Sequence, residues 1–145
     1  MLRTMLTLAI ALQATTPTPV APPPRDPRNW PTPVMDTVPP PIPAMRKGAV
    51  LVLSKTNGFR DPDQIAAAKT VLVGLVRKQH RDVFETENAA VMNPRDLARF
   101  AVVVLSSTSG TIFDDNQRAA FKTWVEKGGG VVLLHGAGGD PQYDW

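Results

Sequence analysis

The sequence predicts a doubly wound α/β domain built on a parallel sheet, and three observations support that class. Four short apolar runs, most of them rich in β-branched residues, indicate buried strands. Amphipathic helical patterns lie between these runs, and helix-capping residues mark where the helices begin. Strands that alternate with helices form a parallel sheet covered on both faces, and right-handed crossovers give the strand order 2-1-3-4.

The strands predict where a ligand would bind. They are expected at Gly48–Ser54, Asp82–Thr86, Ala101–Ser107 and Gly130–His135. Their order is that of flavodoxin-like sheets, whose ligands bind beyond the carboxyl ends of the strands. Three loops should therefore converge at that edge, and they are Lys55–Arg60, Ser107–Phe113 and His135–Asp140.

The helices are predicted from their capping residues. Asp61 with Gln64, and Asp114 with Gln117, have the spacing of capping boxes at the two longer helices. An Asn-Pro pair begins a brief helix over residues 93–100. The sheet is expected to be incomplete at its C-terminal side, because no element follows to cover one face and the edge of the last strand. A fragment or a truncated product would have this form.

Proline marks where the folded part begins. Twelve of the fifteen prolines lie between Pro17 and Pro43. Proline lacks an N–H and disfavours the α region in the residue before it, so this stretch is expected to be disordered. We therefore divide the chain into a leader at residues 1–14, a proline-rich disordered linker at 15–47 and a folded domain at 48–145.

The leader has the pattern of a secretory signal peptide. Arg3 supplies a positive charge, Met5–Leu12 is uncharged and mostly apolar, and Ala14 is a small residue at a plausible cleavage point. The apolar run is too short for a transmembrane helix, which needs about 20 residues. We expect a secreted or periplasmic protein without a membrane span; a frayed apolar N-terminus is the alternative.

Charge and composition exclude several classes of function. Residues 48–145 hold eleven Lys/Arg and eleven Asp/Glu, so the net charge of +3 comes from residues 1–47. A nucleic-acid-binding domain carries a basic stripe, so no nucleic-acid partner is expected. Cysteine is absent, which excludes disulfides, thiolate metal sites and a cysteine nucleophile.

Three segments together resemble a known family. They are LSKTNGFR at Leu53–Arg60, the strand VVVL with the following SSTSG at Val102–Gly110, and GGGVVLLH leading to YDW at Gly128–Trp145. In this order and spacing they resemble the trehalose-utilisation (ThuA-like) family. The resemblance implies a fold similar to class I glutamine amidotransferases, a role in carbohydrate utilisation and a ligand derived from a sugar, but no single reaction.

The chain departs from the family pattern at two places. Family members usually carry a histidine directly after the Phe-Arg pair, and Asp61 stands there. The family domain also continues beyond the Tyr-Asp-Trp stretch, where this sequence ends. Both departures leave open whether the domain is catalytic.

The strongest candidate for catalysis is His135. It ends the fourth predicted strand, where related amidotransferase-like sheets place a nucleophile elbow, and a glycine-rich turn follows it. Its imidazole could act as general base, general acid or metal ligand, or it could bond the loop backbone. Asp140 could orient His135 or bind sugar hydroxyls, and as a turn residue it could instead make an Asx hydrogen bond.

Further candidates come from the other converging loops. Lys55 and Arg60 could hold an anionic or polyhydroxyl ligand, and their alternative is solvated loop charge. The candidate ligand-binding residues are Lys55, Thr56, Arg60, Ser107, Thr108 and Tyr143. Tyr143 and Trp145 could stack on a sugar ring, or they could be core residues displaced in a fragment.

No cofactor and no metal site are expected. The glycines at residues 136–139 lack the strand–turn–helix context of a dinucleotide fingerprint. His80 and His135 would lie at opposite ends of the sheet, so they would not share a metal ion. The expected partner is a small sugar or sugar derivative. The alternatives to an enzyme are a non-catalytic carbohydrate-binding module and a truncated product without activity of its own.

Overall fold

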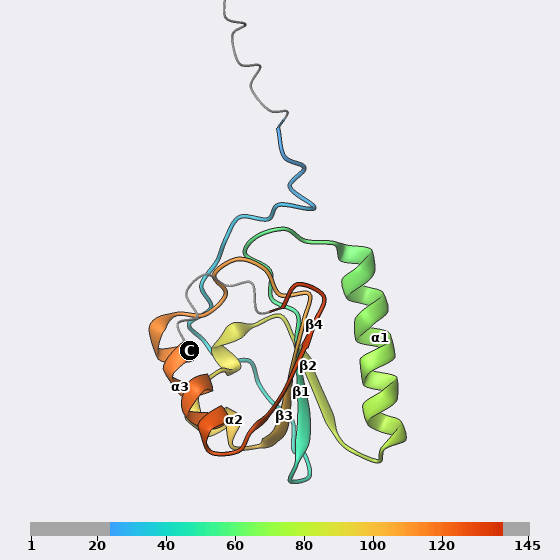
Figure 1. The fold of residues 1–145 in the computed structure, drawn as a ribbon, viewed down its shortest axis with the longest axis vertical. Helices are drawn as coiled ribbons and strands as arrows, with labels where there is room; N and C mark the ends of the chain where they lie inside the picture. Colours follow the sequence, from blue (N-terminus) through green and yellow to red (C-terminus); the bar gives the residue numbers. More distant parts are fainter. Residues whose placement is uncertain (1–23, 138–145) are drawn as a thin grey trace, which may run out of the picture.

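The computed structural model describes residues 24–137, which form a sheet with helices on both faces (Figure 1). In chain order the elements are β1 (Ala49–Leu53), α1 (Pro62–Lys78), β2 (Val83–Thr86), the 3₁₀ helix η1 (Ala89–Val91), α2 (Pro94–Leu97), β3 (Phe100–Ser106), α3 (Asp115–Glu126) and β4 (Gly130–Leu134). The predicted leader lies outside these residues, as do Asp140, Tyr143 and Trp145.

The sheet is parallel throughout and has the order β2-β1-β3-β4, which confirms the predicted fold class and topology. The register aligns equivalent side chains across the sheet. Leu53, Leu105 and Leu133 form one row, and Val52, Val104 and Val132 form the neighbouring row on the opposite face.

Each face of the sheet packs against different helices (Figure 1). Helix α1 covers one face, where Leu72 and Val76 pack against the valines of β1 and β3. Helices α2 and α3 and the 3₁₀ helix cover the other face. That face holds the larger core, with Leu51, Phe113 and Phe121 among its buried residues. Because both faces of the central strands are covered, β1 is apolar at every position and β3 is apolar up to Ser106.

Strand β4 is the exception to this cover. It pairs with β3 alone within the described part of the chain. The sequence predicts one uncovered face, whereas β4 is exposed on both, since Val131 and Leu133 lie on one face and Val132 and Leu134 on the other. Helix α1 lies over β2, β1 and β3, and α3 packs mainly through Phe121 in the larger core, so neither helix reaches far enough to bury β4.

The helix boundaries follow the capping signals closely, with two corrections. Asp61 caps α1 by accepting a hydrogen bond from Gln64 N at 3.0 Å, but the Gln64 side chain accepts from Ser107 Oγ and does not complete the predicted capping box. The Asp114 box of α3 is complete, as predicted. Helix α2 ends at Leu97, before the predicted limit at Phe100, because β3 already begins there.

Residues 24–47, which we call the N-terminal strap, lie against the domain. They contain no helix or strand, in keeping with their prolines. Ile42 and Met45 pack against the larger core, and Arg46 forms an ion pair with Asp82 at 2.7 Å. This differs from the expectation of a disordered linker, because scattered side-chain contacts hold the strap where regular secondary structure cannot.

No helix within residues 24–137 has the length and apolar character needed to cross a bilayer.

Candidate functional site

The loops after β1 and β3 meet at the carboxyl edge of the sheet, as the topology predicts. Thr56 and Ser109 form an isolated parallel bridge, and Asn57 N donates to Ser109 O at 2.7 Å. Gly110 has φ +68°, and a Cβ there would lie 2.7 Å from Gly58 N. Only glycine fits this close crossing of two loops, which fixes their relative position.

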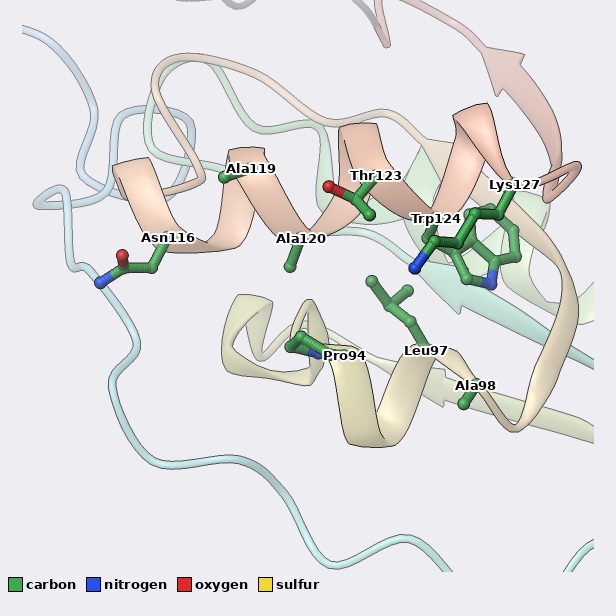
Figure 2. A pocket seen from close by; sticks show the side chains of 9 residues that line it. All are labelled: Pro94, Leu97, Ala98, Asn116, Ala119, Ala120, Thr123, Trp124 and Lys127. Carbon is green, nitrogen blue, oxygen red and sulfur yellow. The ribbon is translucent and has the colours of Figure 1, made fainter.

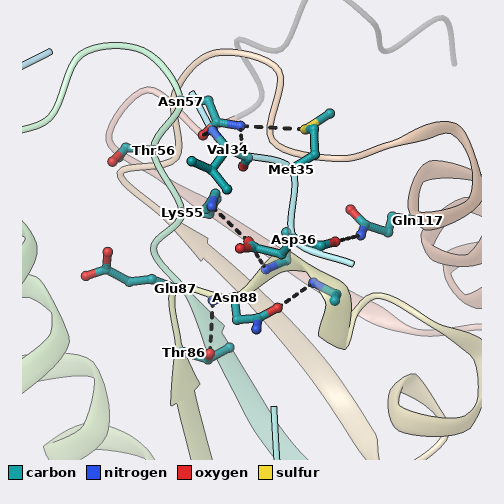
Figure 3. A network of polar contacts seen from close by, with 12 residues as sticks. Val34, Met35, Asp36, Lys55, Thr56, Asn57, Thr86, Glu87, Asn88 and Gln117 are labelled. Carbon is teal, nitrogen blue, oxygen red and sulfur yellow. Dashed lines mark hydrogen bonds and ion pairs between the residues drawn. The ribbon is translucent and has the colours of Figure 1, made fainter. Parts of the chain in front are cut away.

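Lys55 is held in a low-exposure ion pair with the strap (Figure 3). Its ammonium lies 2.8 Å from Asp36 Oδ2, and the two side chains are 12 % and 18 % exposed. The same carboxylate oxygen accepts a hydrogen bond from Ala89 N at 2.9 Å, and the Asp36 backbone carbonyl accepts from Gln117 Nε2 at 2.7 Å. The charge of Lys55 is therefore neutralised within the protein.

Arg60 is also paired. Its guanidinium binds both carboxylate oxygens of Glu87, at 2.8 and 2.9 Å, and donates to Thr56 Oγ1 at 3.1 Å. The hydrogen bonds to Glu87 raise the pKa of Arg60 above its ordinary value, so the charge is permanent. The two predicted ligand-binding cations thus each face a carboxylate, Asp36 and Glu87, that the sequence interpretation did not include.

Two non-glycine residues adopt left-handed backbone conformations at the ends of neighbouring strands. Ser107 follows β3 with φ +56°, and His135 follows β4 with φ +47°. The two strand ends are linked by the hydrogen bond from Ser107 N to Leu134 O, the residue before His135, at 3.0 Å. Such conformations cost energy in residues with a Cβ, and they cluster at functional sites. We call this pair of strand ends, Ser107 and His135, the elbow. The side chain of His135 is exposed there.

The hydroxyl groups near this elbow are mostly buried. Less than a tenth of the surface is exposed in each of Thr56, Ser107 and Thr108. Their hydroxyl groups therefore lie within the packed loops and not on an open surface. Ser107 Oγ donates to Gln64 Oε1. Ser106 Oγ, at the end of β3, is buried and has no hydrogen-bond partner among residues 24–137. A buried hydroxyl without a partner is uncommon, and it marks this strand end as incompletely satisfied.

The remaining predicted positions divide into two groups. Asp140 and Tyr143 lie outside the described residues, so only His135 of the predicted catalytic pair has a described position. His80 follows α1 near Arg46 and Gly48, at the opposite end of the sheet from His135, as expected. Within residues 24–137, no group of three or more histidine, aspartate or glutamate side chains is placed to hold a metal ion.

A groove of about 650 Å³ lies away from the carboxyl edge, between α2 and α3 (Figure 2). Its lining is mostly apolar and includes Leu97, Ala120 and Trp124, with Thr123 and Lys127 as polar contributors. The short α2 and the small side chains of α3 leave this space between the helices. None of the predicted site residues lines it, and it offers no acid–base pair.

Comparison with known proteins agrees with the fold and the loop positions. The family model described as ThuA, trehalose utilisation, matches residues 49–145. No curated protein and no solved structure matches the chain. The matched range begins at β1 and includes every strand of the sheet and each loop of the carboxyl edge. The chain therefore belongs to the ThuA family of trehalose utilisation.

Proposed function

We propose that this chain is an exported protein that binds a sugar or sugar derivative at the carboxyl edge of its sheet, where His135 acts as a general acid or base. The observation that carries the proposal is the elbow formed by Ser107 and His135. These two residues have strained backbones and lie at adjacent strand ends. The imidazole of His135 is exposed there, beside the largely buried hydroxyl groups of the converging loops. An imidazole nitrogen can accept or donate a proton, which suits deprotonation of a sugar hydroxyl.

The electrostatics of the edge favour a neutral ligand over an anion. Lys55 and Arg60 are part of the converging loops, and Asp36 and Glu87 already neutralise them. An anionic ligand that binds either of these two cations would have to replace a carboxylate in an established ion pair. A polyhydroxyl ligand needs only hydrogen-bonding groups and apolar contact, which agrees with the role in trehalose utilisation that describes the family.

A second candidate function is non-catalytic sugar binding. Asp61 stands where the resemblance leads us to expect a histidine, and its carboxylate caps α1 through Gln64 N. A carboxylate committed to a helix cap is a poor substitute for a catalytic imidazole. This contact favours a binding role if the missing histidine is essential to the family's chemistry.

The export part of the proposal rests on the leader sequence. Arg3, the apolar run after it and Ala14 have the order of a signal peptide. N-terminal sequencing of the protein expressed in its host should show cleavage near Ala14. An intact Met1 on a cytoplasmic product would contradict export.

The two histidines of the chain provide a matched test of the site. His80 and His135 both have positive φ, at 55° and 47°, and asparagine tolerates this conformation well. Each histidine→Asn variant therefore removes an imidazole with little backbone penalty. Trehalose titrated by calorimetry should bind the His135→Asn variant at least about tenfold more weakly than the parent, which is about 1.4 kcal/mol.

The His80→Asn variant should bind trehalose like the parent, because His80 lies at the other end of the sheet. Thermal unfolding should show similar midpoints for all three proteins. Unchanged affinity in the His135→Asn variant would refute the assignment of His135. A turnover of trehalose that His135→Asn abolishes would decide for the enzyme over the binding module.

A further inference from the structure

Two aromatic rings are exposed side by side at the carboxyl edge. Trp30 of the strap and Phe59 of the loop after β1 form an edge-to-face pair with ring centroids 5.7 Å apart and an interplanar angle of 67°. Trp30 is 39 % exposed and Phe59 is 49 % exposed. Neither residue belongs to the two core clusters, so core packing does not account for their position.

The backbone around both rings is fixed. Arg60 N donates to Asn29 O, and Asn29 Nδ2 donates to Arg60 O, both at 2.8 Å, so the residues that flank the rings are clamped together. Trp30 N donates to Asp26 O at 2.9 Å, and Ser109 Oγ donates to Phe59 O. The rings are thus held in place while much of their apolar surface stays in contact with water.

Charged residues of the strap accompany Trp30. The Arg25 guanidinium lies over one face of the Trp30 ring, 4.0 Å from its centre. Arg28 binds the Asp26 carboxylate through two nitrogens, at 2.7 and 3.1 Å, and Asp63 at the start of α1 adds a second negative charge near Arg28. Partly exposed aromatic rings with charged side chains nearby are complementary to a pyranose, which has C–H groups on its faces and hydroxyls around its edge.

We infer that Trp30 and Phe59 form a stacking platform for a pyranose ring, with Arg25, Asp26 and Arg28 as hydrogen-bonding partners for its hydroxyls. The inference rests on the proposed sugar-binding function and adds a specific subsite to it. It makes the strap part of the binding site. Phe59 lies within a loop that the sequence predicts to contact the ligand, whereas Trp30 comes from the stretch predicted to be a linker.

The platform has a direct test in sugar binding by aromatic variants. We would titrate trehalose into the parent, Trp30→Ala, Phe59→Ala and Val38→Ala, by calorimetry and by saturation-transfer NMR. Val38 is the matched control, because it is an exposed apolar side chain of the same strap outside the pair. Trp30→Ala and Phe59→Ala should each raise the Kd at least fivefold, Val38→Ala should leave it unchanged, and Trp30→Phe should recover part of the loss.

The outcomes separate this inference from the proposed function. Trehalose binding that is unchanged in Trp30→Ala and Phe59→Ala overturns the platform and leaves the proposed function standing. Binding that is lost in these variants but unchanged in His135→Asn supports the platform and overturns the role of His135. Absence of trehalose binding to the parent by either method overturns both.

Two further measurements test whether the strap stays attached and whether the rings dock a second protein. Thermal unfolding and the Arg46–Asp82 contact, followed by NMR, report whether the strap still lies against the domain in the Trp30→Ala variant. A loss of affinity together with a detached strap would overturn the platform, unless Phe59→Ala weakens binding with the strap in place.

Sedimentation of the parent and Trp30→Ala identifies a protein-docking surface. A dimer that Trp30→Ala dissociates would overturn the sugar assignment.

Discussion

Strands β1 and β4 are both five residues long, apolar and parallel to β3, yet their surroundings differ. Every residue of β1 is buried, whereas every residue of β4 is partly or well exposed. The Leu53–Leu105–Leu133 row shows the difference within one line of side chains, because the first two are almost fully buried and Leu133 is 53 % exposed.

This contrast separates stability from candidate function. Strand β1 has neighbours on both edges and a helix on each face, and its carboxyl end is held by the strap through Lys55 and Asp36. Strand β4 contributes less buried surface but ends in the strained elbow at His135. We infer that substitutions in β1 mainly change the free energy of unfolding, whereas substitutions at the end of β4 mainly change ligand affinity.

The largest expected effect comes from the leucine row. Leu53→Ala should lower the free energy of unfolding by about 3 to 5 kcal/mol, because it removes a buried side chain and leaves a cavity. Leu133→Ala should lower it by less than about 1 kcal/mol, because half of that side chain is already in water. Urea denaturation of both variants measures the difference. Equal losses would mean that β4 is covered in solution.

The strap contact should have a smaller effect. Asp36→Asn leaves the Lys55 ammonium without its partner in a site of low exposure, and it should lower the free energy of unfolding by about 1 to 3 kcal/mol. Amide exchange at the carboxyl end of β1 should become faster, with β4 unaffected. Asp26→Asn is the control, because its partner Arg28 is largely exposed, and its stability should not change measurably. Equal behaviour of the two variants would refute a structural role for the strap.

The acid response of α2 should be smaller still. Burial raises the pKa of Asp96, but hydrogen bonds from Arg95 and Asn93 and the charges of Arg95 and Arg99 outweigh it, so the net pKa is lowered. The stabilisation is therefore complete above the unfolded pKa of about 3.9 and is lost as pH falls through the lower folded value.

Asp96→Asn removes this contribution. The variant should be less stable than the parent near pH 6.5, and the difference should shrink as pH falls below about 4. Urea denaturation at pH 6.5 and pH 3 gives the comparison. A difference that grows on acidification would show that the sign of the pKa shift is wrong.

The sequence predicts the parts of the fold that repeat a local pattern. Apolar runs and capping residues give the four strands and the longer helices, and topology then brings the loops of Thr56 and Ser107 together. Exposure of β4 on both faces was not predicted. A run of valine and leucine indicates an apolar strand, but it does not indicate how far the neighbouring helices extend over that strand.

The site is less predictable than the fold, because its partners are distant in sequence. Asp36 pairs with Lys55 from within a proline-rich stretch, and a single acid there carries no periodic signal. Gln64 has the spacing of a capping box, but its side-chain oxygen accepts a hydrogen bond from Ser107 Oγ instead. The position of His135 could be predicted from its place after a strand, whereas its positive φ is seen only in the structure.

The central claim is that the ligand binds at the carboxyl edge of the sheet, and NMR mapping of a trehalose titration tests it most directly. The largest amide shifts should fall on Thr56, Ser107 and His135, while Gly48 and Ala101 at the opposite end should not move. Shifts concentrated on Thr123, Trp124 and Lys127 would instead place the ligand in the groove between α2 and α3 and contradict the claim.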